Sequence, residues 1–118
     1  MARVDKTESA VGVTRGILAA DIVQADWNKP IPVGINASGL VVKGAGQSGV
    51  IGVVVCDKTN YKAGRPCDIF GNGSELVGCA NLVAGQKYYS DAAGVVSTTA
   101  TGTYLGYTVE ADRLIVMV

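Results

Sequence analysis

The chain has 118 residues, a mass of 12.1 kDa and a formal net charge of zero, from ten Lys+Arg and ten Asp+Glu. This length makes a second independent core unexpected. A neutral chain is poorly suited to nucleic acid, whose phosphates bind clustered excess basic residues. The absence of histidine excludes, within one chain, every catalytic or metal site built on imidazole. With charged residues at only 17%, we expect much of the surface to contact another protein.

Neither a membrane span nor a secretion signal is expected. The longest apolar run, Val50–Cys56, is far shorter than the roughly 20 residues that cross a bilayer. Charged residues at Asp5, Lys6, Glu8 and Arg15 interrupt the first fifteen positions, which therefore lack the apolar core of a signal peptide. The expected partners therefore do not include a membrane.

The three cysteines, Cys56, Cys67 and Cys79, contain no CxxC pair. Two or three thiolates without histidine make a poor zinc site. We interpret them as reduced, buried or half-buried thiols in a reducing compartment, with one disulfide as the alternative.

The elements expected in chain order are mostly short strands. Residues 1–15 are polar and small, without clear periodicity, and predict a flexible N-terminal arm. Ala19–Trp27 contains the one plausible helical turn, which ends before Pro30 because a residue preceding proline avoids the helical region. Glycine-rich turns then separate β-branched runs. These runs predict strands at Ile31–Ile35, Leu40–Lys43, Val50–Cys56, Cys67–Phe70, Glu75–Ala80, Gln86–Ser90, Val95–Thr98, Tyr104–Val109 and Arg113–Val118.

Turn residues predict three hairpins, at residues 71–73, 91–94 and 110–112. Val50–Cys56 is the most apolar run and predicts a central strand buried on both faces. Both faces of the last strand are apolar, so it should be covered by the fold or by a partner. Leu114, Val116 and Val118 share one face, and Ile115 and Met117 share the other.

The fold class follows from this spacing. We expect an all-β chain, a small β-barrel or β-sandwich-like domain of about eight to ten short strands with at most one short helix. Residues 1–15 would form the flexible arm, and residues 16–118 a single β-rich domain.

The sequence offers no site for chemistry. Residues 44–49 match GxGxxG, but the β-branched residues after them predict a strand instead of the helix that a dinucleotide site needs. No carboxylate pair has a spacing that indicates acid–base work, and no flanking residue suggests an activated thiolate. We therefore expect no catalytic residue, no metal and no cofactor, and a protein that is not an enzyme.

Aromatic residues provide candidate contact positions. Strand parity places Tyr104 and Tyr107 on opposite faces of their strand. Tyrosine is favoured in strands and at interfaces, so these rings either pack the barrel or contact another subunit. On the second interpretation, Tyr88, Tyr104 and Tyr107 are subunit-interface residues. Trp27 either fills the core or anchors at a partner surface.

Several short phrases occur in a fixed order from Val50 to the C-terminus, with one upstream. In this order and spacing they resemble the capsid decoration, or cement, proteins of tailed bacteriophages. The phrases are Trp27-Asn28-Lys29-Pro30, residues 49–54 (GVIGVV), residues 63–69 (AGRPCDI), residues 82–96 (LVAGQKYYSDAAGVV) and residues 105–109 (LGYTV).

This resemblance implies a structural protein of the virion that binds the outer surface of an assembled head and stabilises it. Its partners would be the major capsid protein and further copies of itself, in a trimer, with no nucleic acid. It also implies an N-terminal arm that becomes ordered on docking, and on this basis Val4, Val11, Val13 and Trp27 are candidate capsid contacts.

Two alternatives remain open at this point. The chain could be another virion β domain, associated with the tail tube or a fibre. It could also be a small-ligand or carbohydrate-binding β-barrel, which would be a monomer with a concave pocket and converging polar groups.

Overall fold

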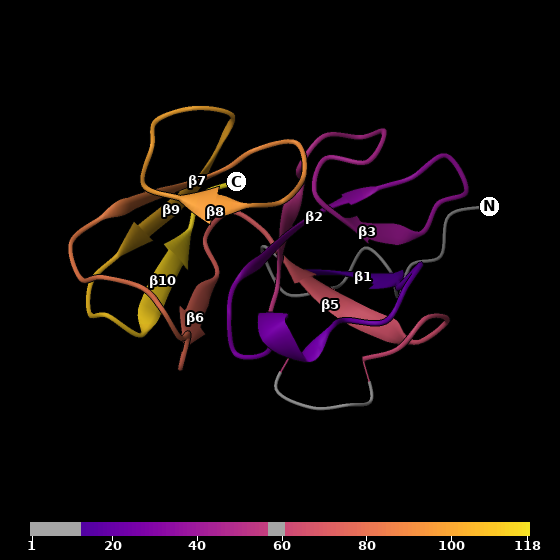
Figure 1. The fold of residues 1–118 in the computed structure, drawn as a ribbon, viewed down its shortest axis with the longest axis horizontal. Coiled ribbons are helices and arrows are strands. Elements are labelled where there is room, and N and C mark those ends of the chain that lie inside the picture. The colour runs from indigo at the N-terminus through magenta and orange to yellow at the C-terminus, as the bar shows by residue number, and fades with distance from the viewer. Residues whose placement is uncertain (1–12, 57–60) are drawn as a thin grey trace.

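A computed structural model describes residues 13–56 and 61–118 (Figure 1). Within these residues, ten strands form two antiparallel five-stranded sheets, and the one helical element is a 3-10 turn, η1 (Gln24–Asp26). The expected all-β class is therefore confirmed. None of the described helical residues form a segment long and apolar enough to span a membrane.

Each half of the chain builds one sheet. The sheets lie side by side in Figure 1, with sheet A in purple to pink and sheet B in brown to yellow. Sheet A has the order β1-β5-β4-β2-β3 and consists of β1 (Val13–Ile17), β2 (Ile31–Ile35), β3 (Val41–Lys43), β4 (Gly52–Val54) and β5 (Pro66–Phe70). Sheet B has the order β6-β10-β9-β7-β8 and consists of β6 (Glu75–Val77), β7 (Lys87–Ser90), β8 (Val96–Ser97), β9 (Thr103–Thr108) and β10 (Arg113–Val116).

Sheet A curls until its two edge strands meet. Leu18, directly after β1, forms a parallel bridge with Val41 of β3, and the Ala19 N–H donates to the Val41 carbonyl at 2.9 Å. Glycine is needed here, because a Cβ on Gly16 would lie 2.4 Å from Cγ2 of Val41. The curled sheet encloses its own core cluster of Leu18, Ile31, Val33, Val41, Val54, Cys67 and Ile69.

A second core cluster joins the two sheets. It contains Val53 of β4 together with side chains of sheet B, and Phe70 of β5 packs against it; its buried members are Val53, Leu76, Cys79, Tyr88, Leu105, Leu114 and Val116. Val53 and Val54 are both 0% exposed and belong to different clusters. The expectation that this strand is central and buried on both faces is therefore confirmed.

Two of the three expected hairpins are confirmed, and one is wrong. β7 pairs with β8, and β9 pairs with β10. The turn at 71–73 instead carries the chain from sheet A to sheet B, because β5 and β6 belong to different sheets. In this crossover the Gly73 N–H donates to the Val116 carbonyl at 2.9 Å, which joins the turn to the last strand of sheet B.

The start of β1 changes the expected boundary of the arm. Residues 13–15 lie in β1 and pair with β5, and Arg15 Nε donates to Asp68 Oδ1 at 2.9 Å. The sequence does not predict this strand because its residues alternate poorly in hydrophobicity. Residues 1–12, which make up the rest of the expected arm, lie outside the described residues.

Candidate functional site

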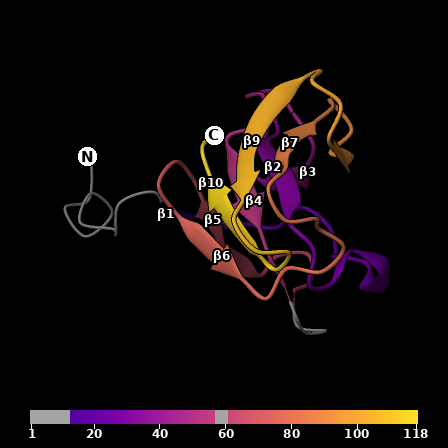
Figure 2. The same ribbon diagram turned by 90° about the vertical axis from the view of Figure 1, so that its left-hand side faces the viewer.

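The outer face of sheet B is the first candidate site. Tyr88 of β7 is buried in the core, so its neighbour Tyr89 points away from sheet A. The Tyr89 and Tyr104 rings contact each other, with centroids 5.3 Å apart, which places Tyr104 on the same outer face. In Figure 2, β9 and β10 of this sheet lie in front of β2 and β4 of sheet A.

A β-bulge brings Tyr104 and Tyr107 to the same face. Tyr88 pairs with Gly106, but Tyr89 pairs with Tyr104, so Leu105 is an extra residue on β9. Tyr107 pairs with Lys87, which shares the outward parity of Tyr89. The expectation that Tyr104 and Tyr107 occupy opposite faces is therefore wrong, because simple alternation does not count the bulged residue.

Exposed apolar and aromatic side chains collect on this outer face. Val77 is 70% exposed, Val109 47%, Met117 41% and Tyr107 40%, which is high for large apolar residues. Soluble chains rarely leave such side chains together on one sheet face unless it contacts a partner. We name this surface the tyrosine face; it comprises Val77, Tyr89, Tyr104, Tyr107, Val109, Ile115 and Met117.

Charged side chains lie on and beside the tyrosine face. Arg113 Nη1 donates to Glu75 at 2.8 Å, and Nη2 donates to Glu110 at 2.7 Å. The hydrogen bond from Arg113 lowers the pKa of the Glu110 carboxyl, and the same bond raises the pKa of Arg113. A row of paired residues crosses the sheet from Glu75 through Ile115 and Tyr107 to Lys87, so Glu75 and Lys87 lie at its two ends. Arg113 pairs with Val77 and therefore lies within the face, whereas Glu75 and Lys87 lie at its two sides.

The last strand explains part of this face. Leu114 and Val116 are 0% exposed in the core, whereas Ile115 is half-buried and Met117 is exposed. The fold thus covers one of the two apolar faces that the sequence identified and leaves the other uncovered. Val77 and Val109 were not singled out from the sequence, although each follows a residue that is buried, Leu76 and Thr108.

The other sequence-predicted positions lie elsewhere. Tyr88, expected at a subunit interface, is 5% exposed, and its hydroxyl accepts a hydrogen bond from the Val83 N–H at 2.7 Å, so the ring packs in its own core. Trp27 is half-buried after η1, and its Nε1 makes a long 3.4 Å hydrogen bond to the Ile22 carbonyl. Val13 is the first residue of β1 and pairs with Phe70 of β5. It is therefore at the end of β1 that is farther along the chain from Trp27. Val4 and Val11 lie outside the described residues.

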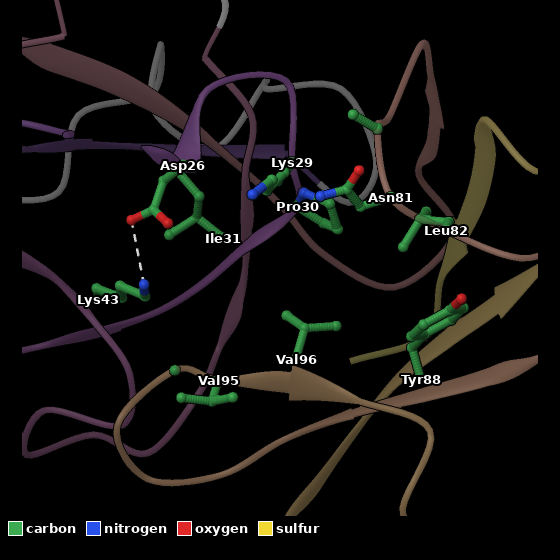
Figure 3. Close-up of a pocket in the computed structure, with 12 residues that line it drawn as sticks. Asp26, Lys29, Pro30, Ile31, Lys43, Asn81, Leu82, Tyr88, Val95 and Val96 are labelled. Carbon is green, nitrogen blue, oxygen red and sulfur yellow. Dashed lines mark hydrogen bonds and ion pairs between the residues drawn. The ribbon is translucent and has the colours of Figure 1, made fainter. Parts of the chain in front are cut away.

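A pocket of about 300 Å³ is the second candidate site (Figure 3). It lies between the sheets, with Ile31 of β2 on one side and Tyr88 and Val96 of sheet B on the other. Asp26 and Lys43, which form an ion pair with Nζ–Oδ2 at 3.1 Å, lie at one end. Polar groups thus converge beside an apolar wall, as the ligand-binding alternative expects.

Cys56, Cys67 and Cys79 are buried, and none lines either site. Burial raises the pKa of the Cys67 thiol, with a further contribution from Asp68. Burial, and then Asp112, raise the pKa of the Cys79 thiol to about 11. Both shifts disfavour the nucleophilic thiolate.

Comparison with solved structures relates the fold to that of a phage chain. No protein-family model matches the chain, and no curated protein matches its sequence. A chain in a solved structure described as Mycobacterium phage Patience shares the fold, with a TM-score of 0.76 and 21% sequence identity. The match covers 98% of this chain and 95% of that chain. The two chains are therefore similar in architecture over nearly their whole lengths.

Proposed function

We propose that this chain is a structural protein of a tailed bacteriophage that binds the outer surface of the assembled head and stabilises it. The observation that carries the proposal is the fold likeness to a chain of a phage structure, which spans nearly all of both chains. A match of this extent relates whole domains of equal size, not one common motif.

The decoration-protein phrases of the sequence support the same role. Residues 49–54 include β4, residues 63–69 lead into β5, residues 82–96 include β7, and residues 105–109 lie in and after β9. The resemblance therefore extends over strands of both sheets. This distribution favours a relation between whole folds over a chance similarity at one turn.

The tyrosine face supplies a surface for assembly. We propose that Tyr104 and Tyr107 contact a neighbouring copy, in the trimer that the resemblance implies. Complete burial of an exposed apolar side chain contributes about 1.5–3 kcal/mol. Burial of the large exposed side chains of this face would therefore contribute substantially to the free energy of association. The major capsid protein would then meet the chain through other surfaces, including the segment that precedes β1.

A decoration role needs no catalysis. A protein that binds only the assembled shell shifts the assembly equilibrium by mass action, and many copies on a repeating lattice add their contributions. A trimer gains further from the effective concentration of its linked contacts. We accordingly propose a non-enzymatic protein located on the virion.

Co-sedimentation with heads tests the proposal and the role of the arm. Purified full-length chain and a variant lacking residues 1–12 are mixed with heads from the encoding phage that lack the chain. Removing residues 1–12 leaves β1 and the Arg15–Asp68 ion pair in place, so the melting temperature should stay within a few degrees.

We expect the full chain to pellet with the heads and the shortened chain to lose most of its binding. If the shortened chain binds with unchanged affinity, the capsid role of Val4 and Val11 is wrong. If the folded full chain does not pellet with heads, the decoration proposal itself is wrong.

A further inference from the structure

The pocket between the sheets has a cationic end and an apolar end. Asp26, Lys29 and Lys43 lie toward one end, and Leu82, Tyr88 and Val96 lie toward the other (Figure 3). Two lysines and one aspartate leave an excess of one positive charge in the lining. A ligand that fits both ends carries a single negative charge on an apolar body.

Lys29 is the group available to such a ligand. The Lys43 ammonium is already held by Asp26 at 3.1 Å, with the Asp26 side chain 23% exposed. Among residues 13–56 and 61–118, no hydrogen bond or ion pair engages the Lys29 ammonium. Lys29 as a whole is half-buried in the pocket wall.

The opposite wall is apolar and fixed. Ile31 is 4% exposed and Tyr88 is 5% exposed, so both are anchored in the core clusters. The Tyr88 hydroxyl is bonded to the Val83 N–H and points away from the pocket, so Tyr88 contributes part of its ring, and not its hydroxyl, to the pocket wall (Figure 3). Leu82 and Val96 are partly buried against the same cluster.

Backbone contacts hold the pocket open in this shape. The Ala80 N–H donates to the Asn28 carbonyl at 2.6 Å, and the Ala45 N–H donates to the Ala92 carbonyl at 3.0 Å. Asn28 and Asn81 have φ of 63° and 64°, the two positive values among described non-glycine residues. Asparagine adopts this left-handed backbone more readily than other non-glycine residues, and here Asn28 precedes Lys29 and Asn81 precedes Leu82.

From these observations we propose that the pocket binds a carboxylate carried on a short apolar body. The carboxylate would accept from Lys29, and the apolar body would lie on Leu82, Tyr88 and Val96. A volume of about 300 Å³ suits a small group of this kind. The carboxylate could belong to a free organic acid or to an acidic side chain beside an apolar side chain in a partner protein. This proposal does not depend on the decoration role.

Two probes distinguish these sources. Hexanoate represents the free acid, and acetyl-Leu-Glu-amide, whose one carboxylate is the glutamate side chain, represents a partner segment. Each is titrated into the ¹⁵N-labelled full chain, with hexan-1-ol as the uncharged control. We expect hexanoate, the dipeptide or both to shift the amides of residues 29, 81, 82 and 96, with binding about fivefold tighter than hexan-1-ol.

Binding of hexanoate alone identifies a free acid, and binding of the dipeptide alone identifies a partner segment. Absence of saturable shifts with both acids overturns the proposal, as does equal binding of hexan-1-ol.

Three variants separate binding from structural damage. Lys29→Gln should weaken binding of the acid about fivefold. Asp26→Asn removes the competing carboxylate and releases Lys43, so it should tighten binding, a gain that damage to the fold cannot produce. Lys87→Gln, on the outer face of sheet B, is the matched control and should change nothing. Equal affinities in Lys29→Gln and Lys87→Gln would contradict the proposed role of Lys29.

Discussion

Among single residues, the buried cysteines give a direct link between burial and the pH dependence of stability. Cys79 is 4% exposed, and burial followed by the charge of Asp112 raises the pKa of its thiol from 9.0 to about 11. A raised pKa means that the unfolded thiol ionises first as the pH increases. The native state therefore keeps its full stability below pH 9 and loses part of it as the pH rises toward 11.

This loss is measurable by urea denaturation between pH 8 and 10.5. The free energy of unfolding should fall with pH, with Cys79 contributing up to about 1.4 kcal/mol per pH unit. Cys79→Ala should be less stable overall because it leaves a cavity, but its pH dependence should be shallower. The remaining slope includes Cys67, whose pKa shifts in the same direction. Identical slopes in the two proteins would contradict the assigned burial of this thiol.

Among the elements, the bulge in β9 decides how the tyrosine face is built. Gly106 permits it, because a Cβ at this position would lie 1.9 Å from the backbone oxygen of Ile115. Gly106 of β9 pairs with the fully buried Val116 of β10. Alanine at position 106 would therefore push the two strands apart.

Gly106→Ala should lower the free energy of unfolding by about 2 to 3 kcal/mol, the usual cost of overpacking a core. Gly39→Ala is the control, since its φ is +80° but nothing lies within 4 Å of its Cβ, so it should cost only about 1 kcal/mol of backbone strain. Chemical denaturation measures both. The packing of β9 on β10 is misassigned if the two variants are equally stable.

At this scale the sequence predicts much of the fold. β2 has the bounds expected from its β-branched run, and β4 is central because Val53 and Val54 are both apolar. The strand β1 was not predicted, since Arg15 and Thr14 interrupt its pattern and its stability comes from pairing with β5. The turn at 71–73 has hairpin chemistry but joins two sheets, because which strands pair depends on tertiary packing that a local pattern does not contain.

The candidate sites show the same limit. Tyr104 and Tyr107 were identified as interface residues, but their common face depends on one bulged residue that alternation cannot reveal. The sequence does not predict the pocket, because Ile31 and Val96 come from different sheets and meet only through packing.

For the whole molecule, the tyrosine face is the surface expected to join copies. Tyr107→Asp places a charge at its centre, next to Ile115 and Lys87 in the sheet register. Self-association measured by sedimentation velocity should weaken, while the stability of the isolated fold should change by less than about 1 kcal/mol because the ring is exposed.

Val23→Asp is the control for this variant, since Val23 is 58% exposed in the loop before η1, outside the tyrosine face. It should leave self-association unchanged. A chain that is monomeric at every concentration, or one equally affected by both variants, would contradict the role given to this face.

The position of the chain on the particle is the central question, and electron cryo-microscopy of heads with and without the chain answers it most directly. We expect one domain-sized density, repeated over the outside of the shell, that is present only when the chain is. Density confined to the tail or a fibre, or no difference between the two samples, would contradict a decoration protein.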